Sequence, residues 1–586
     1  MREDEARTTA DMASARAAGT GVWTGTGARA TFTWLHVPRD GRARGLVVLA
    51  PPVGREHVQS YRVLRQLALL LVDAGCCVAR VSYRGVGDSH ALSTSDDLLV
   101  TWEQNILEAA TQAREVCGIT DQPVYGIGYR VGAGLLTRVA EHFEHVIAWE
   151  PVSGATFVKQ WSRLRRATLP EIPVGEGVDF MGLWLTGAQA AQLSSLPDPR
   201  KIEQLPANVR IHRESDQPRA KVMYGVDSLD VRVHYDVLED LVRLVPRGES
   251  TPLSGAQPGP VRNDFHTPEG VACAEEIVAV TAGGYPGILT GPVDAGSRAG
   301  EIGPRPGKPV TYFAPGASEP RDGSALWSET ARRLAGQGVA SLRADREGAG
   351  DRAMLWSDRD PNPYRYLNAQ ALREQARWLT ERFHTDVVAT VLCSGAWATL
   401  RAAREPAGLP VHGMILINQN EWRMKQEFFD QLRLTYDGDA TLLKRAAASS
   451  EAGAVPAGRI SRVTGTATAW LRPRLRSVKD AAAHVLRNRT PQSVWNVMAR
   501  NPAASIPDDV LERASRDRRV VLLVGPQDAA RYRDTMSDRA VLRLRVRGRD
   551  IRDRFVPEVD HSVLSRTARN EIARQLDDVF AQWKVQ

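Results

Sequence analysis

The sequence has 586 residues, which is too long for one hydrophobic core and leaves room for two large domains. Hydrophobic residues make up 43% and charged residues 25%, proportions that are typical of a folded globular protein and exclude an intrinsically disordered chain. The formal net charge of +7 is small for this length, and no compact basic tract in the first half suggests a nucleic-acid partner.

The five cysteines include no CxxC pair and no metal-ligand spacing, and an odd number argues against a disulfide framework. We therefore expect a cytoplasmic protein with no metal and no other cofactor. Residues 1–20 are polar, acidic and rich in alanine, which predicts a flexible N-terminus rather than a signal peptide. The longest apolar runs, such as Leu67–Val72, fall far short of the ~20 residues that span a bilayer, so no integral membrane segment is expected.

A repeated segment organises the chain. The sequence GCCVARVSYRGVGDS from Gly75 matches GVASLRADREGAGDR from Gly338 at an offset of 263 residues, and the same offset aligns Gly132 with Gly395. In each copy, short apolar runs rich in β-branched residues alternate with amphipathic helical stretches. This alternation predicts an α/β fold in which a mostly parallel sheet has helices on both faces.

The expected strands follow in chain order. In the first copy they are Leu46–Leu49, Val78–Val81, Val124–Ile127 and Val146–Trp149, and in the second Val310–Phe313, Ala340–Arg343, Val387–Leu392 and Met414–Ile417. Residues 246–262 are dense in Pro, Gly and Ser, which is typical of a linker. The runs Gly270–Val280 and Tyr285–Pro292 then predict an opening hairpin of the second sheet. We thus expect one domain over 21–245 and another over 263–586.

The turns that follow these strands resemble those of the α/β-hydrolase superfamily, in which a D-x-x-G-type turn is followed by a strand that ends at a nucleophile elbow. The first copy, with GVGDS, GYRVGA and WEPVSG, most resembles the hydrolase-like proteins associated with exosortase systems. The resemblance implies two tandem α/β-hydrolase domains, each with a lid insertion.

The elbow of the first copy is Gly128-Tyr129-Arg130-Val131-Gly132. Arg130 stands where the superfamily has its nucleophile, and a permanently protonated guanidinium cannot attack a carbonyl. The first domain is therefore predicted to be a pseudoenzyme with a degenerate elbow at Gly128, Arg130 and Gly132. We expect Arg130 to pair with Asp216, Asp88 or Glu150, the alternative being that it extends to solvent.

The elbow of the second copy is Val391–Gly395, and the repeat aligns Cys393 with Arg130. A thiol is a competent nucleophile beside a base, and the similar dienelactone hydrolases use one. Two departures stand against this interpretation: Val391 replaces the first glycine and crowds the turn, and the adjacent Ser394 is an alternative nucleophile. A third reading makes Cys393 a small buried apolar residue.

The superfamily places its acid after a late strand and its histidine in a loop near the C-terminus. RVVLLVGPQD ends at Asp528, and PEVDHSVLSR contains His561. The resemblance implies a triad of Cys393, Asp528 and His561, with an oxyanion hole made by the backbone N–H groups of Ser394 and of Gly316 or Ala317. Alternatively, Asp528 only forms a turn and His561 is a surface histidine.

A helical lid is expected over 421–518. Its segment 459–489 carries eight basic residues against the single acid Asp480. This imbalance fits a docking face for an acidic carrier protein, coenzyme A or an acidic membrane surface, or else a solvated helix face.

These features predict an acyl-transfer enzyme, that is a thioesterase, esterase or acyltransferase, which acts on a small-molecule or carrier-bound acyl substrate. The rival hypothesis is a non-catalytic scaffold or binding protein built from two hydrolase-fold domains. A peptidase or dehalogenase on the same fold is a third possibility, because a fold does not fix its reaction.

Overall fold

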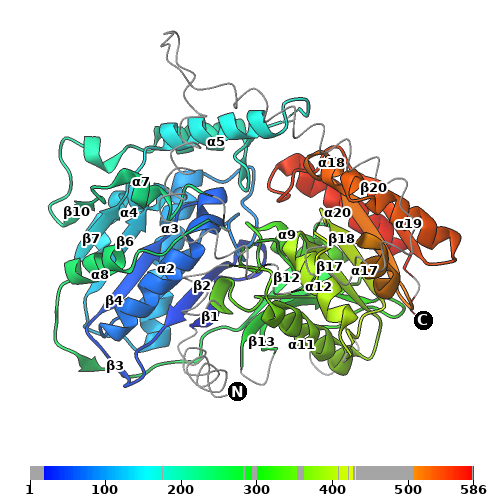
Figure 1. Cartoon of the computed structure of the whole chain (residues 1–586). Coiled ribbons are helices and arrows are strands. Elements are labelled where there is room, and N and C mark those ends of the chain that lie inside the picture. Colours follow the sequence, from blue (N-terminus) through cyan, green and yellow to red (C-terminus); the bar gives the residue numbers. More distant parts are fainter. Residues whose placement is uncertain are drawn as a thin grey trace, which may run out of the picture.

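The computed structural model describes residues 19–583 and 585, apart from 174–175, 227, 229, 281–283, 294–299, 318, 353–361, 407, 420, 426–428 and 430–505 (Figure 1). Residues 1–18 of the predicted flexible N-terminus lie outside this part of the chain. Most of the predicted lid, including the basic segment 459–489, lies outside it as well. No helix in the described ranges has both the length and the apolar composition that a bilayer span requires.

The first half of the chain forms a seven-stranded sheet with the order β1-β2-β5-β4-β6-β7-β10. The strand β2 pairs antiparallel with β1 and β5, whereas β5, β4, β6, β7 and β10 are mutually parallel. The strands are β1 (Thr20–Thr24), β2 (Thr31–His36), β4 (Leu46–Ala50), β5 (Cys77–Ser82), β6 (Val124–Tyr129), β7 (His145–Trp149) and β10 (Val209–His212).

The second half forms a nine-stranded sheet with the order β12-β13-β14-β16-β15-β17-β18-β19-β20. Its first four strands pair antiparallel, and the pairs from β16 to β20 are parallel. The strands are β12 (Arg262–His266), β13 (Ala272–Ala279), β14 (Pro286–Pro292), β15 (Val310–Ala314), β16 (Ala340–Ala344), β17 (Val387–Leu392), β18 (Gly413–Ile417), β19 (Arg519–Val524) and β20 (Ile551–Phe555). We refer to the two sheets with their helices as the first unit and the second unit.

Helices cover both faces of each sheet because successive strand residues point to opposite faces. In the first unit, Val47 and Leu49 pack with α2 and α8, whereas Leu46 and Val48 pack with α3 and α4. The helices of this unit are α2 (Arg55–Asp73), α3 (Leu98–Cys117), α4 (Val131–Arg138), α5 (Gly154–Thr168), α6 (Gly187–Ser195), α7 (Gln217–Lys221) and α8 (Tyr235–Leu244).

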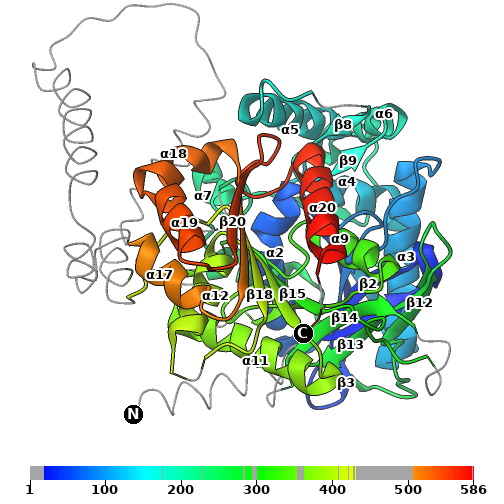
Figure 2. The same ribbon diagram turned by 90° about the vertical axis from the view of Figure 1, so that its right-hand side faces the viewer.

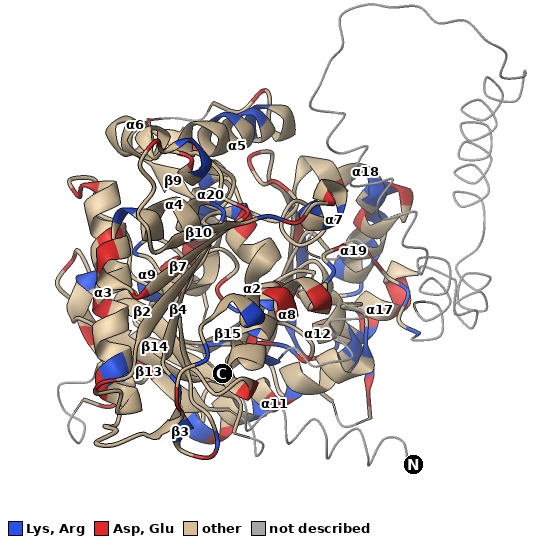
Figure 3. Cartoon of the chain, turned by 90° about the vertical axis from the view of Figure 1, so that its left-hand side faces the viewer, with Lys and Arg blue, Asp and Glu red and all other residues tan. Residues whose placement is uncertain are grey.

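The second unit repeats this layering. Phe313 packs with α9 and α20 on one face, and Tyr312 packs with α11 and α12 on the other. The helices that the structure describes here are α9 (Leu326–Gly336), α11 (Tyr366–Phe383), α12 (Ser394–Arg404), α17 (Pro507–Ala514), α18 (Pro526–Asp534), α19 (Ser537–Val546) and α20 (Arg566–Ala581). On the side shown in Figure 3, basic and acidic residues are interspersed over α3, α8 and α17.

The strands predicted from the sequence are confirmed. Each of the eight expected runs falls within one of β4 to β7 or β15 to β18. The predicted hairpin is the antiparallel pair of β13 and β14, in which Ile277 lies opposite Ile288, but β12 precedes it and pairs with β13, so the hairpin does not open the sheet. The protein therefore has an α/β fold with mixed, mostly parallel sheets.

The segment 246–262 contacts the first unit before the chain enters the second sheet, whose strand β12 lies near β2 of the first unit (Figure 2). Thr251–Pro252 (β11) pairs antiparallel with Arg42–Ala43 (β3), and the carbonyl of Pro260 accepts a hydrogen bond of 2.9 Å from the N–H of Trp23. The two units also share apolar packing, because Trp23, Phe32 and Trp34 of the first form one buried cluster with Ile288 of the second. The antiparallel ends of the two sheets therefore face each other.

Candidate active site

The strand β17 ends at Cys393, and α12 begins with the next residue. Cys393 has φ +50° and ψ −113°, a backbone conformation that is costly for a residue with a side chain and that is found mainly at functional sites. A methyl group at Gly395 would lie 2.5 Å from the carbonyl oxygen of Ala314, so glycine is required there. This sharp turn presents Cys393 at the C-terminal edge of the sheet.

The crowding expected from Val391 does not change the turn. The elbow of the first unit, with Gly128 at the matching position, places Arg130 at φ +58° and ψ −117°, nearly the conformation of Cys393. Val391 is fully buried in the core beside the sheet. The second unit therefore keeps the geometry of the elbow without its first glycine.

Asp528 and His561 come from different loops and meet beside this elbow. Asp528 lies in the first turn of α18, and His561 lies between β20 and α20. The Nδ1 atom of His561 is 2.8 Å from Oδ2 and 3.0 Å from Oδ1 of Asp528. The carboxyl group is buried, whereas the imidazole is partly exposed. Thus the acid can orient the ring while the other side of the ring is available to a reactant.

The protonation of His561 reflects its two neighbours. Burial on its own lowers the pKa of His561, but hydrogen bonds to Asp528 and Cys393, together with the negative charges of these groups, raise this pKa to about 11. His561 is therefore the link between Cys393 and Asp528, and it holds its proton at neutral pH.

Asn418 is a supporting residue that the sequence did not reveal. Its side-chain N–H groups donate to the carbonyls of Asp560 and His561 at 3.1 and 2.8 Å, and its Oδ1 accepts from the N–H of Gly525 at 2.8 Å. It therefore ties the histidine loop to the turn that precedes Asp528. The only feature of the sequence that could have pointed to this role is the position of the asparagine directly after the buried strand β18.

The predicted oxyanion residues lie around Cys393. A methyl group at Gly316 would be 3.2 Å from Cβ of Cys393, and Ala317 has φ +42°. Ser394 is the first residue of α12, where a backbone N–H has no partner within the helix. Gly316 and Ser394 thus both adjoin Cys393.

The hydroxyl of Ser394 has a different environment from the thiol. Ser394 is buried, its hydroxyl donates to the carbonyl of Ala317 at 3.4 Å, and it accepts from Nη1 of Arg346 at 3.4 Å. The hydroxyl is thus directed to the loop after β15, whereas Cys393 is the residue of the elbow that acts on the pKa of His561.

Arg346 is a second residue that the sequence did not reveal. It is buried, it occupies the position of Tyr83 in the first copy, and its Nη2 donates to the carbonyls of Ala317 and Gly316 at 2.6 and 3.3 Å. Burial lowers the pKa of Arg346 to about 10, although the negative charges of Cys393 and Glu319 act in the opposite direction. Arg346 therefore holds the loop of the oxyanion residues and places a positive charge near the thiol.

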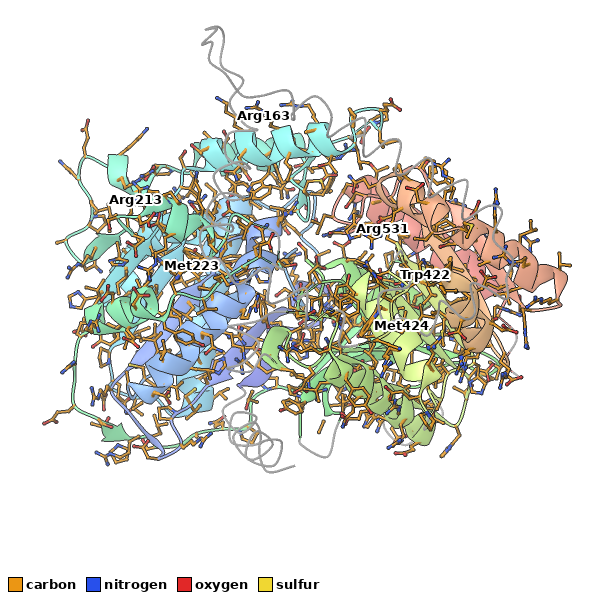
Figure 4. All side chains as sticks on the ribbon, viewed as in Figure 1. Arg163, Arg213, Met223, Trp422, Met424 and Arg531 are labelled. Atoms are coloured by element: carbon orange, nitrogen blue, oxygen red, sulfur yellow. The ribbon has the colours of Figure 1, made fainter. Side chains whose placement is uncertain are left out.

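Tyr364 is an aromatic residue near Cys393. The ring of Tyr364 stacks on Phe429 at 4.4 Å and contacts Trp397 edge-on. Burial and the charge of Cys393 raise the pKa of Tyr364. Glu421 forms an ion pair of 2.8 Å with Arg531, which Figure 4 shows near Trp422. The charges of Cys393, Glu421 and Arg531 all act on the pKa of Tyr364, so this tyrosine lies near both the thiol and the ion pair.

The elbow of the first unit is occupied by a buried ion pair. Nε and Nη2 of Arg130 each lie 3.2 Å from an oxygen of Glu56, and the guanidinium lies 4.0 Å from the ring centre of Tyr224. Burial on its own lowers the pKa of Arg130, but Glu56 raises it above its usual value. Arg130 is therefore held as a cation inside the unit and does not extend to solvent.

The prediction that Arg130 pairs with the carboxylate of Asp216, Asp88 or Glu150 is wrong. Asp216 caps α7 by accepting from the N–H of Arg219, and Asp88 binds Arg321 and Arg343 of the second unit. Glu150 contributes only its backbone carbonyl to Arg130, at 3.3 Å. The actual partner, Glu56, lies 74 residues earlier in the first turn of α2, a separation at which the sequence gives no indication of contact.

We expect Arg130→Ser to lower the melting temperature without creating an esterase. The substitution leaves Glu56 buried without its partner, which should cost about 3–5 kcal/mol, and no histidine is supplied to activate the new hydroxyl. Arg213→Ser is the matched control, because it removes a longer, more exposed ion pair with Glu150. Both variants would be melted and assayed with p-nitrophenyl acetate in a Cys393→Ala background. Equal melting temperatures for the two variants, or ester hydrolysis by the Arg130→Ser protein, would contradict this prediction.

Comparisons with known proteins reveal only remote similarity. No family model matches the chain, and no curated protein matches its sequence. A dienelactone hydrolase from Anabaena variabilis is 14% identical, with a TM-score of 0.30 over 55% of this chain and 99% of that one. A Pyrobaculum calidifontis esterase is 13% identical, with a TM-score of 0.29 over 53% and 84% of the two chains. A lidless α/β serine hydrolase from Xanthomonas campestris is 13% identical, with a TM-score of 0.26 over 53% and 95%. The function must therefore be inferred from the residues around Cys393.

Proposed function

We propose that the second unit, residues 263–586, is an α/β-hydrolase domain that transfers or hydrolyses the acyl groups of esters or thioesters through Cys393, His561 and Asp528. The first unit, residues 21–245, would be a degenerate domain of the same fold. The observation that carries the proposal is His561, whose ring is oriented by a buried carboxylate and whose pKa is raised by that carboxylate and by the nearby Cys393 at a positive-φ elbow.

The reaction would begin with attack of the Cys393 sulfur on the acyl carbonyl carbon. The carbonyl oxygen would take up the negative charge and accept hydrogen bonds from the backbone N–H groups of Ser394 and of Gly316 or Ala317. The tetrahedral intermediate would then expel the alcohol or thiol, which receives the proton held by His561. Water, or an acceptor nucleophile, would then attack the carbonyl carbon of the acyl-enzyme and pass its proton to His561. The bond from this carbon to the Cys393 sulfur would break, which releases the acyl product and restores the pair of the Cys393 thiolate and protonated His561.

A non-catalytic scaffold is the weaker hypothesis. A binding module requires neither a thiol in a strained backbone conformation nor a histidine whose ring is oriented by a buried acid. Docking of an acidic carrier at the basic segment 459–489 stays a prediction, as does the resemblance of the first half to exosortase-associated proteins.

Acyl labelling tests the proposed function. The protein would be mixed with excess p-nitrophenyl acetate, quenched in acid and digested, and its peptides would be mapped by mass. We expect a rapid release of one p-nitrophenol per chain and an acetyl group on Cys393. An acetyl group on Ser394 in place of Cys393 would assign the nucleophile to the hydroxyl. A chain that releases no p-nitrophenol and carries no acetyl group would favour the scaffold.

A further inference from the structure

We infer that the first unit positions the reaction site of the second: its residues Asp88, Arg80 and Tyr61 fasten the two loops that line Cys393. This inference rests on the proposed function of Cys393. It assigns to the degenerate unit a role in the reaction that does not require a nucleophile of its own.

Two reciprocal ion pairs cross the boundary between the units. Arg80 binds Asp351, and Arg343 binds Asp88 with Nε 3.3 Å from Oδ1. Arg343 lies 263 residues after Arg80, and Asp351 lies 263 residues after Asp88, which is the offset of the repeat. The same arginine–aspartate contact is therefore made twice, as in the self-complementary interface of a twofold dimer. All four side chains are buried.

Arg321 joins these two pairs at the centre. Its Nη2 lies 2.6 Å from Oδ2 of Asp88, and its Nη1 lies 3.0 Å from an oxygen of Asp345 and 3.0 Å from one of Asp351. The hydroxyl of Tyr61 donates to Asp351 at 2.6 Å. Burial on its own lowers the pKa of Arg321, but the surrounding carboxylates, Asp88 first among them, raise it well above its usual value. Arg321 is therefore a fixed cation bound to both units.

The same residues belong to the loops of the reaction site. Arg321 lies in the loop between β15 and α9 that also contains Gly316 and Ala317, and its backbone N–H donates to Asp345 at 2.7 Å. Asp345 directly precedes Arg346, whose guanidinium holds the carbonyls of Gly316 and Ala317. A displacement of Arg321 or Asp345 would thus move the oxyanion residues and the cation beside the thiol.

The contacts across the boundary are not symmetric, because only the second unit has an arginine at the centre of the two ion pairs. When the one-residue slip of this loop is counted, the residue of the first unit that corresponds to Arg321 is His57. His57 is buried, and burial together with the nearby Arg80 lowers its pKa to about 4, so it is uncharged at neutral pH. The first unit therefore contributes Asp88 to the loop of the second without an equivalent cation at its own matching position, His57 in α2. Because a buried charge without its partner is strongly unfavourable, the contacts of Arg321 favour a single loop geometry.

The test is Asp88→Asn in the full chain, a substitution that keeps the size of the side chain and removes its charge. With p-nitrophenyl acetate we expect kcat to fall about 10-fold or more while KM stays within about 2-fold, because misplaced groups act mainly on the transition state. Amide hydrogen exchange of the peptide spanning 314–326 should become faster. In a double-mutant cycle, adding Asp88→Asn to Arg321→Gln should lower kcat no further than Arg321→Gln alone.

Glu56→Gln is the matched control. It disrupts the buried pair with Arg130 inside the first unit, so it should lower the melting temperature but leave kcat and the exchange of 314–326 unchanged. Tyr61→Phe is a second, milder variant, because it removes only one hydroxyl, and it should reduce kcat a few-fold. It provides the test if the Asp88→Asn protein does not fold. Unchanged exchange and kcat in the variants of Asp88 and Tyr61, or an equal loss of kcat in Glu56→Gln, would overturn the inference. Failure of the proposed function can be told apart from failure of this inference. If the proposed function is wrong, the parent protein is not acylated at Cys393, but the hydrogen exchange of 314–326 still shows whether Asp88 and Tyr61 hold the loop.

Discussion

Replacing Cys393 with alanine is expected to abolish turnover of p-nitrophenyl acetate, with a loss of about 10⁴-fold or more, because the substitution removes the only sulfur at the elbow. The fold should be retained. Alanine keeps the Cβ atom, and Cys393 is only partly buried, so little packing is lost. The measurement is the initial rate of p-nitrophenol release at matched protein concentration, accompanied by a thermal melt.

Ser394→Ala is the control for this experiment. Its hydroxyl contacts Ala317 and Arg346, so we expect a loss of only a few-fold from disturbed loop contacts. If the alanine variant at 394 is inactive and the one at 393 is active, the nucleophile is Ser394 and the proposed role of the thiol is wrong.

The second large effect is expected at His561. His561→Ala should lower the acylation rate about 10⁴-fold, and Asp528→Asn should be about 10- to 100-fold less severe, because the histidine handles the proton whereas the acid orients the ring. Pre-steady-state release of p-nitrophenol measures the acylation step directly. An acylation rate in His561→Ala equal to that of the parent would eliminate the histidine from the reaction.

The protonation of His561 gives this prediction a pH dependence. A titration of His561 by NMR should give a pKa near 11, and Asp528→Asn should lower it because one of the two hydrogen bonds to the imidazolium then loses its charge. Since the folded pKa lies above the unfolded value of 6.5, the contacts of protonated His561 stabilise the fold fully below pH 6.5. This contribution is lost as the pH rises through about 11. A titration midpoint near 6.5 in the parent would show that the thiol and the acid do not act on the ring.

The parts of the fold that the sequence predicted are those with a periodic or local signature. Apolar runs of strand length located the central strands of both sheets, and the antiparallel run that opens at Gly270 matches β13 and β14. The glycines on either side of Arg130, and the repeat that aligns Arg130 with Cys393, located two turns that the structure shows at positive φ. Each of these features depends on residues that are close in sequence.

The residues that escaped prediction are buried polar groups with distant partners. Glu56 holds Arg130 from 74 residues away, and Arg321 reaches Asp88 from 233 residues away. A buried arginine or asparagine after a strand has the same sequence signature as an exposed one, so the positions of Arg346 and Asn418 after β16 and β18 did not reveal which groups they bind. Only the tertiary fold specifies which carboxylate or carbonyl each one meets.

Joining the two units in one chain has a consequence for stoichiometry. In a twofold dimer of identical chains, every substitution occurs in both chains. An arginine at the position of Arg321 would then lie opposite its own copy, and both arginines would have to share the carboxylates that bind Arg321 alone in this protein. A single chain carries unlike residues at related positions, here His57 with Arg321, Tyr83 with Arg346 and Arg130 with Cys393. One half can therefore specialise in support while the other keeps its chemistry. At a saturating concentration of p-nitrophenyl acetate, we accordingly expect one acetyl group per chain, on the second unit, rather than one on each unit.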